Sequence, residues 1–149
     1  MANQIANSFK TMLWKGQIAA GSDDFKIILL QIGFVFDKDT HNSYSDVSAY
    51  ELPTANGYTI AGVTLTLDAI TTDNTEDRAE ITFLNAQWTA SGGSLSTVGA
   101  IVYDDSTAVG SGDDEDKAIV GFIDASGTQI VADGAALTVS SIMFTAEDI

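Results

Sequence analysis

The sequence predicts a mainly β protein: one antiparallel β-sandwich or jelly-roll-like domain with a single N-terminal helix. Its 149 residues suit one domain, and 45% of them are hydrophobic, which is enough for a sizeable core. Several short apolar segments follow one another, separated by turn-forming residues and without helical patterns between them, so a βαβ fold is disfavoured. We predict a helical segment over residues 1–22 and a β-sandwich domain over residues 23–149.

Residues 5–16 carry the only helical pattern. The apolar residues of this stretch recur at i, i+4, i+7 and i+8, namely Ile5, Phe9, Met12 and Leu13. Gly16 supplies a stop signal. Trp14 falls on the opposite face, where a later loop could cover it or where it could anchor a neighbouring subunit, since tryptophan is enriched at interface hot spots.

The strands follow in order. Residues 25–36 (FKIILLQIGFVF) are apolar on both alternating faces, which predicts a central strand or two shorter strands that meet at Gly33. Apolar and polar residues alternate over residues 63–68 and 79–84, which is typical of half-buried strands. Short strands are also predicted over residues 95–103, 118–124 and 137–144. The turn signals are Asn56-Gly57, Ser91-Gly92-Gly93, residues 110–116, Ser126-Gly127 and Asp133-Gly134.

The charge balance restricts the partners. Asp and Glu number 21 against six Lys and Arg, for a net charge of −15. Such a surface repels nucleic-acid phosphates and anionic membranes, so neither is a predicted partner. Basic proteins, cations and neutral surfaces stay open, and acidity also keeps an abundant protein soluble. Cysteine is absent, and neither a signal-peptide pattern nor a membrane-length apolar run occurs, so we expect folding in the cytoplasm.

The sequence does not predict an enzyme. His41 is the only imidazole and lies in a polar loop, and no Gly-x-Ser-x-Gly motif accompanies it. We expect His41 to be solvated or to cap a turn. Paired catalytic carboxylates need apolar walls, whereas most acidic residues here cluster in turns.

Calcium is the one metal that the acidic turns could hold, because it takes carboxylate and amide oxygens. The candidates are Asp113, Asp114, Glu115 and Asp116, and separately Asp73, Asn74, Glu76 and Asp77. Neither set matches an EF-hand or a repeat-type calcium motif, and adjacent acids more often repel one another and face water. The prediction is therefore no cofactor, with calcium at these loops as the weaker alternative.

Several segments occur in an order that resembles one family. They are DFKIILL (24–30), THNSYSDVSAYE (40–51), GYT (57–59), GVTLT (62–66), DNTEDRA (73–79), Trp88, AIVY (100–103) and GFID (121–124). Together they resemble a family of small tailed-phage virion proteins over roughly residues 24–145, although each motif alone is weak. The N-terminal helix and the acidic loop 110–117 depart from the family pattern.

The resemblance implies a non-enzymatic β-sandwich present in many copies on a virion assembled in the host cytoplasm. Its implied role is head decoration, as a cement protein that contacts the major capsid protein or other virion proteins. A homo-oligomer is implied, with a trimer as one form. A tail, collar or fibre position is the first alternative. A carbohydrate-binding adhesion module is the second, with Trp14, Trp88, Tyr44, Tyr50 and Tyr58 as stacking platforms.

Three residues are candidates for contacts with a neighbouring subunit: Trp14, Phe9 and Arg78. Arg78 is the only arginine and lies between Asp77 and Glu80. It predicts either a bidentate ion pair across a subunit contact or a local pair on the domain's own surface.

Overall fold

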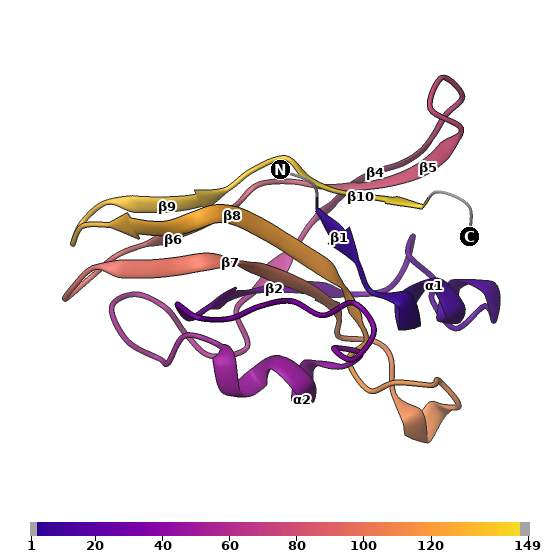
Figure 1. The fold of residues 1–149 in the computed structure, drawn as a ribbon, viewed down its shortest axis with the longest axis horizontal. Coiled ribbons are helices and arrows are strands. Elements are labelled where there is room, and N and C mark those ends of the chain that lie inside the picture. Colours follow the sequence, from indigo (N-terminus) through magenta and orange to yellow (C-terminus); the bar gives the residue numbers. More distant parts are fainter. Residues whose placement is uncertain (1–2, 147–149) are drawn as a thin grey trace.

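The fold was analysed in a computed structural model, which describes residues 3–146. The strands are β1 (Gln4–Ile5), β2 (Phe25–Leu30), β3 (Val63–Leu65), β4 (Leu67–Asp73), β5 (Arg78–Phe83), β6 (Ala86–Thr89), β7 (Leu95–Asp104), β8 (Ile119–Val131), β9 (Ala136–Val139) and β10 (Ile142–Ala146). The helices are α1 (Asn7–Trp14) and α2 (Tyr44–Val47), with 3-10 turns η1 (Ser48–Tyr50) and η2 (Val109–Ser111). The prediction of a mainly β, antiparallel sandwich with an N-terminal helix is confirmed (Figure 1).

The main sheet has the order β1-β8-β7-β2-β3, with antiparallel pairing throughout. β2 is an interior strand between β7 and β3, and all of its residues except Lys26 are buried, as the unbroken apolar run predicts. The strand ends at Leu30, however, so the prediction of strand structure as far as Phe36 is wrong. Gly33 has a φ of +94° in a turn that Phe34 N–H closes by donating to the Gln31 carbonyl oxygen.

The residues after this turn fold back over the outer face of the main sheet. The rings of Phe34 and Phe36 lie 5.6 and 5.5 Å from the ring of Phe122 on β8. The apolar residues that predict a second strand therefore serve as a cover for the sheet, since burial against another element satisfies them equally well.

The second layer consists of a three-stranded sheet, β10-β5-β4, and a pair, β6-β9. β5 runs on into β6 and β9 into β10, and the partners Phe83↔Ile142 and Ala86↔Val139 keep the two segments opposite each other. They form one bent ribbon. The single strand predicted over residues 137–144 is therefore two strands, because Ser141 takes a positive φ of 55° between them.

A similar change of sheet occurs at Thr66. β3 ends at Leu65 in the main sheet, and β4 begins at Leu67 in the second layer. The predicted strand over residues 63–68 thus divides between the layers and joins them covalently.

The N-terminal segment belongs to the sandwich as well as carrying the helix. β1 pairs with β8 through Gln4↔Phe122 and Ile5↔Gly121. Gly121 permits this approach, because a Cβ there would stand 2.1 Å from the Gln4 carbonyl oxygen. Helix α1 is two residues shorter at each end than predicted, and its Phe9 and Met12 are buried in the core.

Candidate interaction surfaces

His41 has a structural role in the loop over residues 37–46. Its Nδ1 accepts a hydrogen bond from the Asp37 N–H at 3.1 Å, and its ring stacks on Phe34 at 5.4 Å. The imidazole therefore caps a turn, as predicted, and packs on the aromatic cover of the sheet.

The segment over residues 40–51 builds a capped helix. Ser43 and Asp46 form a capping box at the start of α2, in which the Asp46 carboxylate accepts from the Ser43 N–H at 2.9 Å. Residues 40–51 thus form a helix start followed by a buried acid, Glu51.

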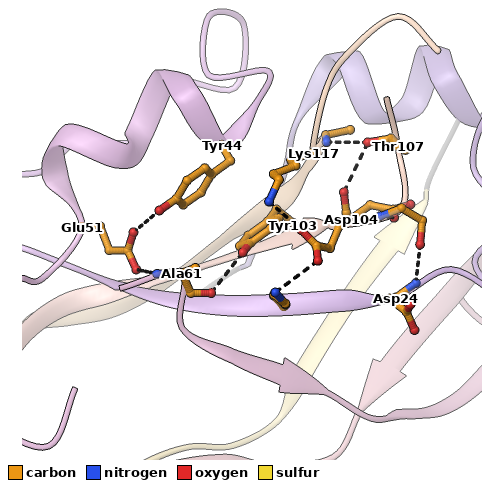
Figure 2. A network of polar contacts seen from close by, with 12 residues as sticks. Asp24, Tyr44, Glu51, Ala61, Tyr103, Asp104, Thr107 and Lys117 are labelled. Carbon is orange, nitrogen blue, oxygen red and sulfur yellow. Dashed lines mark hydrogen bonds and ion pairs between the residues drawn. The ribbon is translucent and has the colours of Figure 1, made fainter. Parts of the chain in front are cut away.

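Glu51 is the centre of a polar network, shown in Figure 2. Its side chain is 3% exposed, and Oε1 accepts from the Tyr58 hydroxyl at 2.6 Å and from the Ala61 N–H at 2.7 Å. The Tyr44 hydroxyl donates to Oε2. Burial and these bonds raise the pKa of Tyr44 and Tyr58, so both phenols stay protonated donors.

This network fixes the long connection between β2 and β3 on the sheet. The Tyr58 hydroxyl accepts from the Leu29 N–H at 3.2 Å, and the Tyr103 hydroxyl donates to the Ala61 carbonyl oxygen at 3.0 Å. Sequence reasoning did not single out Glu51. The available signal was one acid flanked by Tyr44 and Tyr58 at equal spacing, seven residues on either side.

A second polar cluster lies where β7 ends (Figure 2). The Asp105 carboxylate pairs with Lys26 at 3.1 Å and with Lys117 at 2.9 Å. Lys117 also stands over the rings of Tyr44 and Tyr103, at 5.9 and 6.0 Å from their centroids. These contacts bind the acidic loop 105–118 to the main sheet.

Asp104, next to this ion pair, is fully buried. Its Oδ1 accepts from the Ser106 N–H at 2.9 Å, whereas no donor in the described chain reaches Oδ2. Burial, together with the nearby carboxyl groups of Asp23 and Asp113, raises the pKa of Asp104 to about 7. Asp104 therefore holds a proton through the acidic and near-neutral range.

The first set of calcium candidates is occupied by local contacts. Asp113 accepts from the Ala108 N–H at 2.9 Å, and Asp116 accepts from the Val109 N–H at 2.6 Å. Asp114 pairs with Lys15 of the N-terminal segment at 2.7 Å.

The second set behaves in the same way. Asp73 accepts from the N–H groups of Thr75 and Glu76, at 2.9 and 3.2 Å, inside the hairpin turn. Across residues 3–146, no three acidic or histidine side chains converge as metal ligands would. The carboxylates of Asp73, Asp113 and Asp116 thus order their own loops.

The three candidate contact residues differ in accessibility. Trp14 is 72% exposed, so the expectation that a later loop covers it is wrong. Phe9 is only 2% exposed, because the apolar face of α1 packs onto the sandwich, and it is a core residue rather than a contact residue. Arg78 pairs with Glu80 at 2.9 Å and lies 3.7 Å from Asp73, which is the local arrangement on its own hairpin.

The five aromatic residues named for sugar stacking do not form a platform. Trp88 and Tyr58 are buried with their rings 6.0 Å apart, and Tyr44 is held in the Glu51 network. Trp14 and Tyr50 remain exposed, but they lie on α1 and η1 respectively.

Charge is distributed unevenly along the molecule. In Figure 1 the acidic loop 105–118 and the tip of the β4–β5 hairpin lie toward the right, whereas the ends of β6, β7, β8 and β9 lie at the left. We define the low-charge end as residues 31–33, 54–58, 90–94 and 125–135. It contains one charged residue, Asp133, although charged residues make up 18% of the chain.

Comparisons with known proteins gave no match: no family model, no curated protein and no solved structure is significantly similar to the chain. None of the helices within residues 3–146 is long and apolar enough to cross a membrane.

Proposed function

We propose that this chain is a non-enzymatic structural protein of a tailed-phage particle, and that its role is decoration of the head. One observation carries the proposal: the segments that resemble phage virion proteins form the structural frame of the sandwich. DFKIILL contains the buried interior strand β2, and the run over residues 40–51 supplies the capping box and the buried Glu51. The residues on which the resemblance to phage virion proteins depends thus have structural roles in the sandwich.

The mechanism would be packing against other virion proteins. A decoration protein adds contacts between neighbouring capsid subunits, and each contact contributes roughly 25 cal/mol per Å² of buried apolar area. Repetition over a shell makes the sum large even where one contact is weak. The major capsid protein is the proposed partner, with assembly in the host cytoplasm, and the net charge of −15 disfavours binding to the packaged nucleic acid.

The test is the copy number and position of the chain in purified particles of the phage that encodes it. Head decoration predicts one or a few copies per major capsid subunit by gel densitometry, and density on the outer surface of the head by electron microscopy. About a dozen copies would assign the chain to the tail or collar. Complete absence from the particles would overturn the proposal.

A further inference from the structure

The loops over residues 54–58, 90–94 and 132–135 of the low-charge end are joined by hydrogen bonds into one preformed surface. Ala90 N–H donates to the Ala135 carbonyl oxygen at 2.9 Å, and Gly134 N–H donates to the Ala90 carbonyl oxygen at 2.8 Å. The Asn56 side chain donates to the Ser94 carbonyl oxygen at 3.1 Å. Such a surface loses little conformational entropy when a partner binds.

The single charge of this end is engaged within it. The Asp133 carboxylate accepts from the Gly92 N–H at 2.9 Å, between the two loops that it joins. The rest of this end consists of Ala, Gly, Ser, Thr, Asn and Gln, the buried Tyr58, the half-buried Val131, and two exposed apolar side chains, Ile32 and Ile130, which are 65% and 67% exposed. Small residues permit close approach, and the isoleucines supply apolar area.

A groove adjoins this surface. It has a volume of about 320 Å³ and lies between β8 and β9, with Leu29, Ala100, Ile123 and Leu137 among its lining residues. Among residues 3–146, Asp124 is the only charged residue that lines it. Exposed apolar side chains of one copy could pack into the groove of another copy, so the same chain supplies both sides of a complementary contact.

The charge distribution indicates which kind of partner would bind at the low-charge end. A basic partner would be attracted to the acidic end, where loop 105–118 carries five of the 21 acidic residues, and would gain nothing at the low-charge end. A second copy of this chain carries the same charge of −15, so contact through the acidic ends would bring carboxylates together. In a two-fold contact each surface meets itself, so the low-charge end avoids the repulsion that two predominantly acidic ends would meet.

We propose that two copies of this chain associate through their low-charge ends, with Ile130 in the contact and the acidic ends pointing away from each other. This contact is independent of the role in the phage particle, and it would leave both acidic ends free for other partners.

Sedimentation velocity of the purified chain over a wide concentration range tests this contact. The expected result is a reversible dimer whose dissociation constant rises at least tenfold in Ile130→Asp, since this variant places a carboxylate within the apolar contact. Val109→Asp is the matched control, because Val109 is 53% exposed but lies in the acidic loop, and it should leave the dimer unchanged. Circular dichroism and thermal melting confirm that each variant is folded.

Salt separates this contact from an ionic one. Raising NaCl should strengthen the dimer or leave it unchanged, because the net repulsion between two acidic copies is screened. A chain that stays monomeric at all concentrations, a dimer that salt dissociates, or a dimer weakened equally by Val109→Asp would overturn the inference. A monomer found on phage heads would leave the proposed function intact, whereas a dimer absent from particles would remove only the function.

Discussion

At the scale of single residues, two buried carboxyl groups behave in opposite ways because of what surrounds them. Glu51 is buried among three donors, so its negative charge is satisfied. Asp104 is buried beside Asp23, so one of its oxygens faces another acid instead of a donor. In the sequence each acid directly follows a tyrosine, so the two look alike. Their environments cannot be told apart there, because the groups that surround each carboxyl come from distant segments of the chain.

Asp104 should make the stability of the protein depend on pH. Its pKa is about 7 in the folded state against 3.8 for a free aspartate, so the stabilising contribution is complete below pH 3.8. It is lost as the pH rises to 7, because the unfolded chain ionises more easily than the folded one. Asp104→Asn has no proton to lose and keeps a donor toward Asp23, so we expect it to gain stability relative to the wild type over this range, by up to about 4 kcal/mol.

Urea unfolding between pH 4.5 and pH 9 measures this difference. Asp68→Asn is the control, because Asp68 is exposed and its substitution should give a nearly constant difference. If the gain in Asp104→Asn is the same at pH 4.5 as at pH 8, then Asp104 does not carry the buried proton.

At the scale of elements, the sequence predicts the strands well and their sheet membership poorly. Predicted strands over residues 79–84 and 95–103 match β5 and β7 closely, because alternation and β-branched content are local signals. The pattern Val63, Leu65, Leu67 continues unchanged across the point where the chain moves between layers. A period of two records which face is buried, but not which sheet buries it.

Irregular strands limit the prediction in the same way. β8 was expected to end at Asp124, before the turn signal Ser126-Gly127, and instead continues to Val131. The four residues 125–128 bulge opposite Val98, because Gly99 pairs with Asp124 and Thr97 with Gln129. The turn residues are correct for their backbone angles, but pairing with β7 before and after the bulge keeps the chain in the sheet.

Gly62 is the residue on which the entry into β3 depends. It has a φ of +70°, and an added Cβ would stand 1.8 Å from the Ile27 carbonyl oxygen on β2. We expect Gly62→Ala to lower the free energy of unfolding by about 3 kcal/mol or more, since strain and a backbone clash combine. Gly134→Ala shares the positive φ but meets open space, so it should cost only about 1 kcal/mol.

Chemical denaturation of the two variants beside the wild type makes this comparison. Equal losses in the free energy of unfolding would mean that β3 can shift away from β2 to accommodate the added methyl group. The connection over residues 52–62 would then be held less tightly than the Glu51 network indicates.

At the scale of the whole molecule, the arrangement of charge matters more than its total. The composition predicts an acidic surface, and individual segments without charge are visible in the sequence. Only the topology brings the loops 54–58, 90–94 and 132–135 together at one end, because the first connects β2 to β3, the second β6 to β7 and the third β8 to β9. The same limit applies to the candidate contact residue Phe9. The helical period places Phe9 on the apolar face of α1, but only the packing of α1 on the sandwich shows that this face belongs to the core.

The concentration of carboxylates at the other end should make the protein sensitive to ionic strength. With a net charge of −15, mutual repulsion opposes the compact state, and screening by NaCl relieves it. We expect the melting temperature to rise by about 2–6 °C between 10 and 300 mM NaCl, which corresponds to about 1–2 kcal/mol for a domain of this size. Differential scanning calorimetry measures the shift.

Adding calcium or magnesium in the same calorimetric experiment tests whether the acidic loops bind calcium. Because Asp113, Asp116 and Asp73 accept hydrogen bonds from backbone N–H groups of their own loops, 2 mM CaCl₂ in 150 mM NaCl should act like 2 mM MgCl₂, as a further screening salt. A bound ion would instead stabilise the folded state in proportion to its occupancy. A rise of several degrees with calcium but not with magnesium would show that these acidic loops rearrange around the ion, and would restore the calcium alternative.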